Sequence, residues 1–144
     1  LIGMATVSTS AHEAKKIGYL KDSDGITMNR NRLLFDAKIK AIDLSKKYKI
    51  PEKTIYRLPG KTAVAAIKLT MENMQSRGEI SQYDKFIGEI IAYVLSGGDT
   101  DISKEVSEEN ILKLEKDAIY KLMKENLTIE RLEHILETGK YLRN

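Results

Sequence analysis

The chain has 144 residues, the size of one ordinary domain, and it contains no cysteine. A chain of this length can bury a core, and it gives no reason to expect two domains. The lack of cysteine excludes a disulfide framework and a cysteine-ligated zinc site, and it makes a reducing compartment, the cytoplasm, the expected location. No apolar run approaches the roughly 18 residues that a membrane span requires, so we expect no membrane span.

The formal net charge of +3 is unevenly distributed. Residues 1–80 carry 15 Lys or Arg and 8 Asp or Glu, whereas residues 81–144 carry 9 and 13. A basic first half is compatible with nucleic acid, with coenzyme A phosphates, with an acidic partner domain or simply with a solvated surface. Lysine outnumbers arginine by 18 to 6, although arginine is the better ligand for base edges. We therefore expect no nucleic-acid partner.

The first residues, Leu1-Ile2-Gly3-Met4, lack the basic and apolar regions of a signal peptide. They do not look like a native start either, because the initiator methionine is missing. We therefore expect the chain to be a piece of a longer protein.

A short helix is predicted over about residues 11–17. Ser10 and Glu13 have the spacing of a capping box, in which the Ser10 side chain bonds the amide of Glu13 and Glu13 reaches back to the amide of Ser10. Gly18 is placed to end this helix in a left-handed conformation.

A long amphipathic helix is predicted over about residues 30–48, where apolar residues recur at spacings of three and four. Met28 or Asn29 stands where its cap belongs. Pro51 closes the region, and residues 51–60 are predicted to be a connector that contains an extended stretch around Ile55.

Beyond the connector, apolar stripes predict four more helices. Their start signals are Lys61 after Leu58-Pro59-Gly60, Ser81, Ser107 and Thr128, and their stop signals include Gly78, Gly97-Gly98 and Gly139. The helix after Ser81 is apolar on most of its circumference, so we expect it to be central. Five to six helices without a strand pair predict an all-α helical bundle.

The sequence contains none of the common catalytic motifs. The sequence has no glycine-rich dinucleotide or phosphate loop, no nucleophile elbow and no zinc-binding H-E-x-x-H helix. The two histidines, His12 and His134, are interpreted as a solvated side chain and a partner of neighbouring glutamates. The turn before Lys61 offers exposed amides and a cation to an anion, but a plain helix entry is the favoured interpretation.

Several ordered motifs carry a resemblance to a known family. Thr9-Ser10-Ala11-His12-Glu13-Ala14, together with Ile17-Gly18-Tyr19-Leu20, resembles a helix of the crotonase (enoyl-CoA hydratase) family. The run from Asp24-Gly25-Ile26-Thr27-Met28-Asn29-Arg30 to Asp36-Ala37-Lys38 resembles the segment after that helix in bacterial bifunctional 3-hydroxyacyl-CoA dehydrogenases. Leu95-Ser96-Gly97-Gly98-Asp99 and the ending His134-Ile135-Leu136-Glu137-Thr138-Gly139 resemble the tail of the same family. Asn31 departs from the pattern, in which an aspartate is expected.

The resemblance implies a fatty-acid β-oxidation enzyme whose C-terminal helical region is this chain. Residues 1–50 would be the last helices of the crotonase-like domain, residues 51–60 the connector and residues 61–144 a helical extension. The segments that supply catalytic groups should precede Leu1, so no catalytic role is carried over and the fragment is expected to be inactive. NAD and acyl-CoA are implied for the parent, whose activities would be those of a 3-hydroxyacyl-CoA dehydrogenase and enoyl-CoA hydratase.

Three roles are implied for such a tail: covering the acyl-CoA site, docking on upstream domains of the same chain, and building a homo-oligomer. Arg30, Arg32 and Lys61 are the candidates for contacts with coenzyme A phosphates, since cations at helix starts suit anionic groups. Their alternative role is surface solubility or salt bridges at a domain interface. No metal ligand is predicted. The rival hypothesis for the whole chain is a stand-alone helical protein–protein interaction module.

Overall fold

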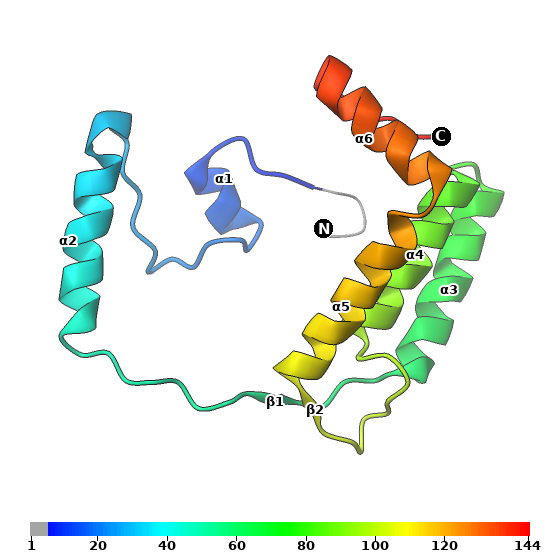
Figure 1. Cartoon of the computed structure of the whole chain (residues 1–144), viewed down its shortest axis with the longest axis horizontal. Helices are drawn as coiled ribbons and strands as arrows, with labels where there is room; N and C mark the ends of the chain where they lie inside the picture. Colours follow the sequence, from blue (N-terminus) through cyan, green and yellow to red (C-terminus); the bar gives the residue numbers. More distant parts are fainter. Residues whose placement is uncertain (1–5) are drawn as a thin grey trace. The chain divides into compact units, whose positions relative to one another are not determined.

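The computed structural model of the chain describes residues 6–144, so the predicted non-native start at Leu1-Ile2-Gly3-Met4 lies outside the described residues. The chain separates into two compact units, Leu1–Glu52 and Lys53–Asn144. Within residues 6–144 there are six α-helices, one 3-10 helix and one two-stranded sheet (Figure 1). The predicted all-α class is confirmed.

The first unit begins with helix α1 (Ala11–Lys16), capped as expected by the Ser10 side chain, which accepts from the amide of Glu13 at 3.1 Å. The second half of the predicted capping box is wrong in one detail. The Glu13 carboxylate accepts from the amide of Thr9 at 2.6 Å, one residue further back than Ser10. The Thr9 hydroxyl donates to the same oxygen, and this second bond explains the choice.

The 3-10 turn η2 (Arg30–Arg32) leads directly into helix α2 (Leu33–Ser45). The Asn29 side chain caps the turn by accepting from the amide of Asn31 at 3.0 Å, as the sequence suggests. The predicted helix is nearly right but too long at its end, because the backbone changes to separate turns after Ser45. None of the residues of α2 is buried within its unit.

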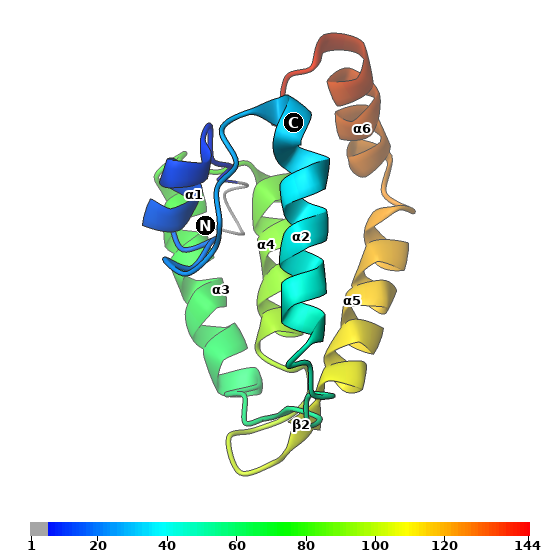
Figure 2. The ribbon, with the colours of Figure 1, turned by 90° about the vertical axis from the view of Figure 1, so that its left-hand side faces the viewer.

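The second unit contains four helices: α3 (Lys61–Ser76), α4 (Gln82–Leu95), α5 (Glu108–Leu122) and α6 (Asn126–Thr138). Helix α4 packs against both α3 and α5, which confirms that it is central within this unit (Figure 2). Ser81 and Ser107 cap α4 and α5 through their side chains, as predicted, and Gly139 ends α6 with a φ of 68°.

The predicted cap of the last helix is wrong. Helix α6 begins at Asn126 with Glu125 as its N-cap, so Thr128 lies inside the first turn. The Thr128 hydroxyl is 2.5 Å from the hydroxyl of Tyr83 on α4. A threonine is a good cap in isolation, but here its hydroxyl has a partner on another helix.

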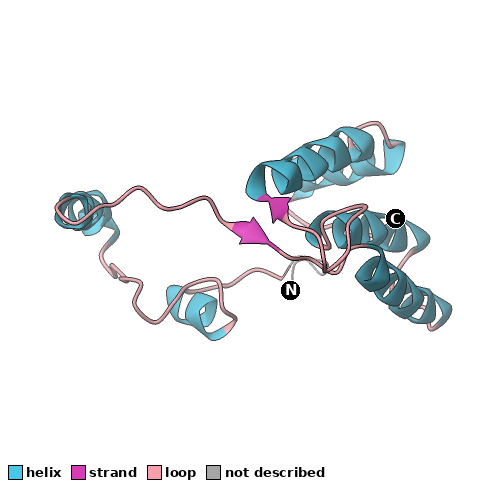
Figure 3. Cartoon of the chain, turned by 90° about the horizontal axis from the view of Figure 1, so that it is seen from below, coloured by secondary structure: helices cyan, strands magenta, loops and turns pink. Residues whose placement is uncertain are grey.

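A small sheet joins the start of the unit to the start of α5. Its first strand confirms the extended stretch predicted around Ile55, whereas the pairing of two strands was not predicted. Strand β1 (Ile55–Tyr56) pairs antiparallel with β2 (Val106–Ser107), with Ile55 opposite Ser107 and Tyr56 opposite Val106 (Figure 3). Val106 is buried, and an ion pair of 3.2 Å between Arg57 and Glu105 continues the same register. Two-residue strands carry no readable alternation, so sequence patterning cannot show which of them pair.

The start of α3 packs closely against the loop that follows α4. The core includes Ile80, Tyr83, Ala92 and Val106. Gly60 is buried against the backbone of Thr100, and its amide donates to the carbonyl oxygen of Ser96 at 2.8 Å. The entry of α3 is therefore held against the loop that follows α4.

Candidate functional site

One hollow described in the second unit is a groove of about 480 Å³ bounded by α3, α4 and α5. Its lining combines an apolar floor with four charged residues at the rim. The floor is formed by Val64, Phe86, Ile90, Tyr93, Leu114 and Ala118, and the rim by Lys68, Glu89, Asp117 and Lys121. Pockets that bind small molecules have volumes of this order and a similar mixture of surfaces.

The helical period explains how these side chains converge. Lys68 lies one turn after Val64 on α3, and Phe86, Glu89, Ile90 and Tyr93 recur at spacings of three and four on α4. Because α4 packs against both α3 and α5, this stripe of side chains faces the groove between them.

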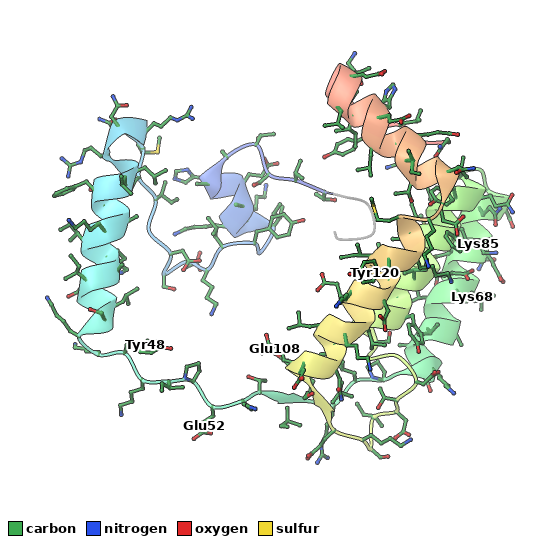
Figure 4. The ribbon with its side chains drawn as sticks, in the orientation of Figure 1. Tyr48, Glu52, Lys68, Lys85, Glu108 and Tyr120 are labelled. Atoms are coloured by element: carbon green, nitrogen blue, oxygen red, sulfur yellow. The ribbon has the colours of Figure 1, made fainter. Side chains whose placement is uncertain are left out.

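Ion pairs between α3 and α4 border the groove. The Lys68 ammonium is 3.4 Å from the Glu89 carboxylate, and Lys85 lies 3.6 Å from Glu72 and 4.0 Å from Glu89. Figure 4 shows Lys68 on α3 and Lys85 on the neighbouring α4. The two lysines and two carboxylates balance each other, so this side of the groove has no net charge to offer to a strongly anionic ligand.

The other rim is formed by α5. The Lys121 ammonium lies 5.2 Å from the centre of the Phe86 ring, a cation–π contact that brings the lysine stem over the apolar floor. At the end of the groove, burial and a hydrogen bond to Asp99 raise the pKa of Tyr93 above its usual value. Tyr93 therefore stays a neutral hydrogen-bond donor at physiological pH.

The lining of the groove contains lysine, tyrosine and carboxylate side chains but no serine, cysteine or histidine. No cluster of three or more potential metal ligands occurs in residues 6–144. In that same range no helix has both the length and the apolar character to cross a bilayer.

The predicted phosphate-binding residues fall on different units. Arg30 and Arg32 lie together in η2 of the first unit, and Lys61 begins α3 in the second. Arg32 pairs with Asp36 at 3.2 Å and lies 5.5 Å from the Phe35 ring centre, while Arg30 has no ion pair within the described residues. Phosphate binding by these two arginines stays a prediction.

Lys61 is placed at a helix start, as expected, with partners from the loop after α4. Its ammonium lies 3.3 Å from the carboxylate of Asp99, and its amide donates to Thr100 at 3.4 Å. The amide of Gly60 is also bonded, to Ser96. An anion arriving here would compete with these groups, although Lys61 as a phosphate ligand remains a prediction.

The sequence did not predict a cluster of polar side chains around Arg131. Arg131 of α6 donates to Asp84 of α4 at 2.9 Å and to the side chain of Asn144 at 2.7 Å, and its guanidinium lies 5.0 Å from the Tyr83 ring centre. Burial disfavours ionisation of Asp84, but hydrogen bonds from Ser81 and Arg131 outweigh it and lower the pKa of this carboxyl. No local spacing links residues so far apart in sequence.

Neither histidine lines the groove or takes part in the cluster around Arg131. His12 is exposed and His134 is partly exposed, and neither forms an ion pair in the part of the chain that the structure describes. The expected glutamate partner of His134 is thus not among the ion pairs of residues 6–144.

The described residues thus form an all-α protein whose second unit has a groove lined by α3, α4 and α5. Over 144 residues the chain is 40% identical to a protein of Bacillus subtilis (strain 168) named "Probable 3-hydroxyacyl-CoA dehydrogenase". The match covers 99% of this chain and 18% of that relative, so the chain spans less than a fifth of the relative's length. No family model matches the chain, and no solved structure matches it.

This similarity agrees with the dehydrogenase part of the resemblance carried by the sequence motifs. The relative's name says nothing of a hydratase, so the crotonase part stays a prediction.

Proposed function

We propose that the chain is a helical part of a longer 3-hydroxyacyl-CoA dehydrogenase, in its C-terminal region, and that its role there is to dock on other parts of the enzyme. The observation that carries the proposal is similarity along 99% of the chain to only 18% of a dehydrogenase relative.

Helix α2 supports the docking role. It carries apolar side chains but has no buried residue, and Leu34 and Phe35 are 83% and 57% exposed within the described structure. Exposed apolar faces of this kind are typical of surfaces that other protein parts cover. The cover would be upstream domains of the same chain, a second copy in a homo-oligomer, or both.

In this proposal the parent uses NAD and acyl-CoA, works in the cytoplasm and adds hydratase activity to the dehydrogenase. The helical part would help to cover the acyl-CoA site. Arg30, Arg32 and Lys61 remain the proposed contacts for coenzyme A phosphates. Asp36 neutralises Arg32, and Asp99 neutralises Lys61. Arg30 is therefore the strongest of the three candidates.

The test compares three proteins: the full product of the encoding gene, that product lacking this segment, and the 144-residue chain. We measure intact mass, NADH formation from a 3-hydroxyacyl-CoA and hydration of an enoyl-CoA. A product several times larger that is active, beside an inactive 144-residue chain, supports the proposal. A native product as short as this chain, with neither activity, would replace it with the stand-alone interaction module.

The docking role has its own test in the full-length protein. Leu34→Ser should weaken the docked state by about 1 to 3 kcal/mol, because one leucine no longer enters an apolar interface. Lys40→Ser, at another exposed position of α2, is the matched control and should change little. In the isolated chain both variants should unfold like the wild type. Equal effects of the two variants in the full protein would contradict docking through this face.

A further inference from the structure

Helix α6 is attached to its unit differently from the other three helices. Like α6, helices α3 and α5 contain no fully buried residue, but each has half-buried apolar side chains such as Val64 and Leu114, whereas every apolar side chain of α6 is exposed. The apolar side chains of α6 stay substantially exposed, from 36% for Ile135 to 84% for Leu136. Figures 1 and 2 both show α6 reaching beyond the ends of α3 and α4. Apolar packing therefore does little to hold it.

Polar contacts at one point take the place of that packing. The Arg131 side chain is only 17% exposed and bonds Asp84, itself 16% exposed, at the first turn of α4. The same guanidinium bonds the side chain and the main-chain oxygen of Asn144, at 2.7 and 3.2 Å. Charge-assisted bonds in a partly buried setting are stronger than exposed surface pairs.

The segment after α6 completes the same cluster. Arg143 lies 3.6 Å from Asp84, and the Asn144 amide donates to Glu130 at 2.9 Å and to the carbonyl oxygen of Leu127 at 3.3 Å. Residues 140–144 thus return along α6 and end at its fastening point. The neighbouring hydroxyl pair of Tyr83 and Thr128 adds one more polar bond between α4 and α6.

The turn between α5 and α6 is short. Helix α5 ends at Leu122 and α6 begins at Asn126, with Glu125 as an N-cap that makes no side-chain capping bond. Short turns at helix ends without strong caps are places where backbone angles change most readily.

We propose that α6 is a latched arm: Arg131 fastens it to α4 through Asp84 and residues 140–144, and opening this latch frees α6 while α3, α4 and α5 stay folded. The latch defines α6 as a separate opening unit beside three helices in which α4 packs against both α3 and α5. The proposal concerns the chain itself and does not depend on the activity of a parent enzyme.

Hydrogen exchange on the 144-residue chain, resolved by residue, tests the latch. In Arg131→Gln the amides of α6 should exchange about ten to a hundred times faster than in the wild type, because a charge-assisted contact is lost. The amides of α4 from Phe86 onward should keep their wild-type rates. Arg77→Gln, which removes an exposed arginine paired with Glu79, is the control and should leave α6 unchanged.

A milder variant guards against a general loss of folding. Asn144→Ala removes the side-chain bonds of the returning segment and leaves the Arg131–Asp84 pair, so it should raise exchange in α6 by a smaller factor in the same place. Acceleration of α4 and α6 by the same factor in either variant would overturn the proposal, because α6 would then belong to the cooperative core. Unchanged exchange in α6 in both variants would overturn it as well.

Discussion

Replacing Gly60 by alanine should be among the most damaging single changes in the second unit. Gly60 has a φ of 55° and a ψ of −134°, a combination that residues with a side chain rarely adopt. A Cβ atom at this position would lie 1.8 Å from the carbonyl oxygen and 2.3 Å from the carbonyl carbon of Thr100. These are backbone atoms, so the clash cannot be relieved by a side-chain rotation.

The magnitude is the sum of two effects. The unfavourable backbone conformation costs about 1 to 3 kcal/mol. Moving Thr100 away also weakens the bond that its carbonyl oxygen accepts from the amide of Lys61, which contributes about 0.5 to 1.5 kcal/mol. We therefore expect Gly60→Ala to lower the free energy of unfolding by about 1.5 to 4.5 kcal/mol.

Gly78→Ala is the matched control. Gly78 also has a positive φ, 71°, but an added Cβ would meet nothing within 4 Å. It should lose only about 1 to 2 kcal/mol, the cost of a left-handed alanine. Urea unfolding followed by circular dichroism compares the two variants. Equal losses would refute the reasoning, because the approach of Thr100 would then have no energetic consequence.

The remaining predictions concern a carboxylate and a cap. The folded-state pKa of Asp84 is lowered from the ordinary 3.8, so its ionisation stabilises the fold above that pH, and this stabilisation is lost as the pH falls through the lowered value. Urea unfolding should therefore find Asp84→Asn less stable than the wild type by about 1 to 2 kcal/mol near neutral pH, with a smaller gap in strong acid; a gap that widens in acid would contradict this. Ser107→Ala should lower stability by about 1 kcal/mol, because Ser107 accepts from the amide of Asn110 at the start of α5. Ser103→Ala, in an exposed loop, should change the urea midpoint less, and the opposite order would count against the cap.

Most helices could be predicted from local signals because their caps act within three residues. Ser10, Ser81 and Ser107 each bond the amide three positions later, and such bonds depend on little beyond the sequence around them. Thr128 has the same chemistry, but the nearby Tyr83 hydroxyl engages it instead. Local patterning cannot anticipate that partner, which lies 45 positions away in the sequence.

The candidate sites were less predictable than the helices. The spacing of Lys85 and Glu89 suggests a pair along one helix, yet Glu89 lies closer to Lys68 of the neighbouring helix. Which residues meet across helices depends on the rotation of each helix, and apolar periodicity gives that only approximately. The Arg131–Asp84 pair depends in addition on the direction taken by the chain after Leu122.

The short sheet has a consequence for the order in which the second unit assembles. Ile55 and Ser107 are brought together across a long stretch that contains all of α3 and α4. Closing so long a loop is entropically unfavourable unless the intervening chain is already compact. Contacts between neighbouring helices, by contrast, join residues close in sequence and form quickly. We therefore expect the two strands to pair late in folding, after α3 and α4 have packed together, and their pairing to set the starting point of α5.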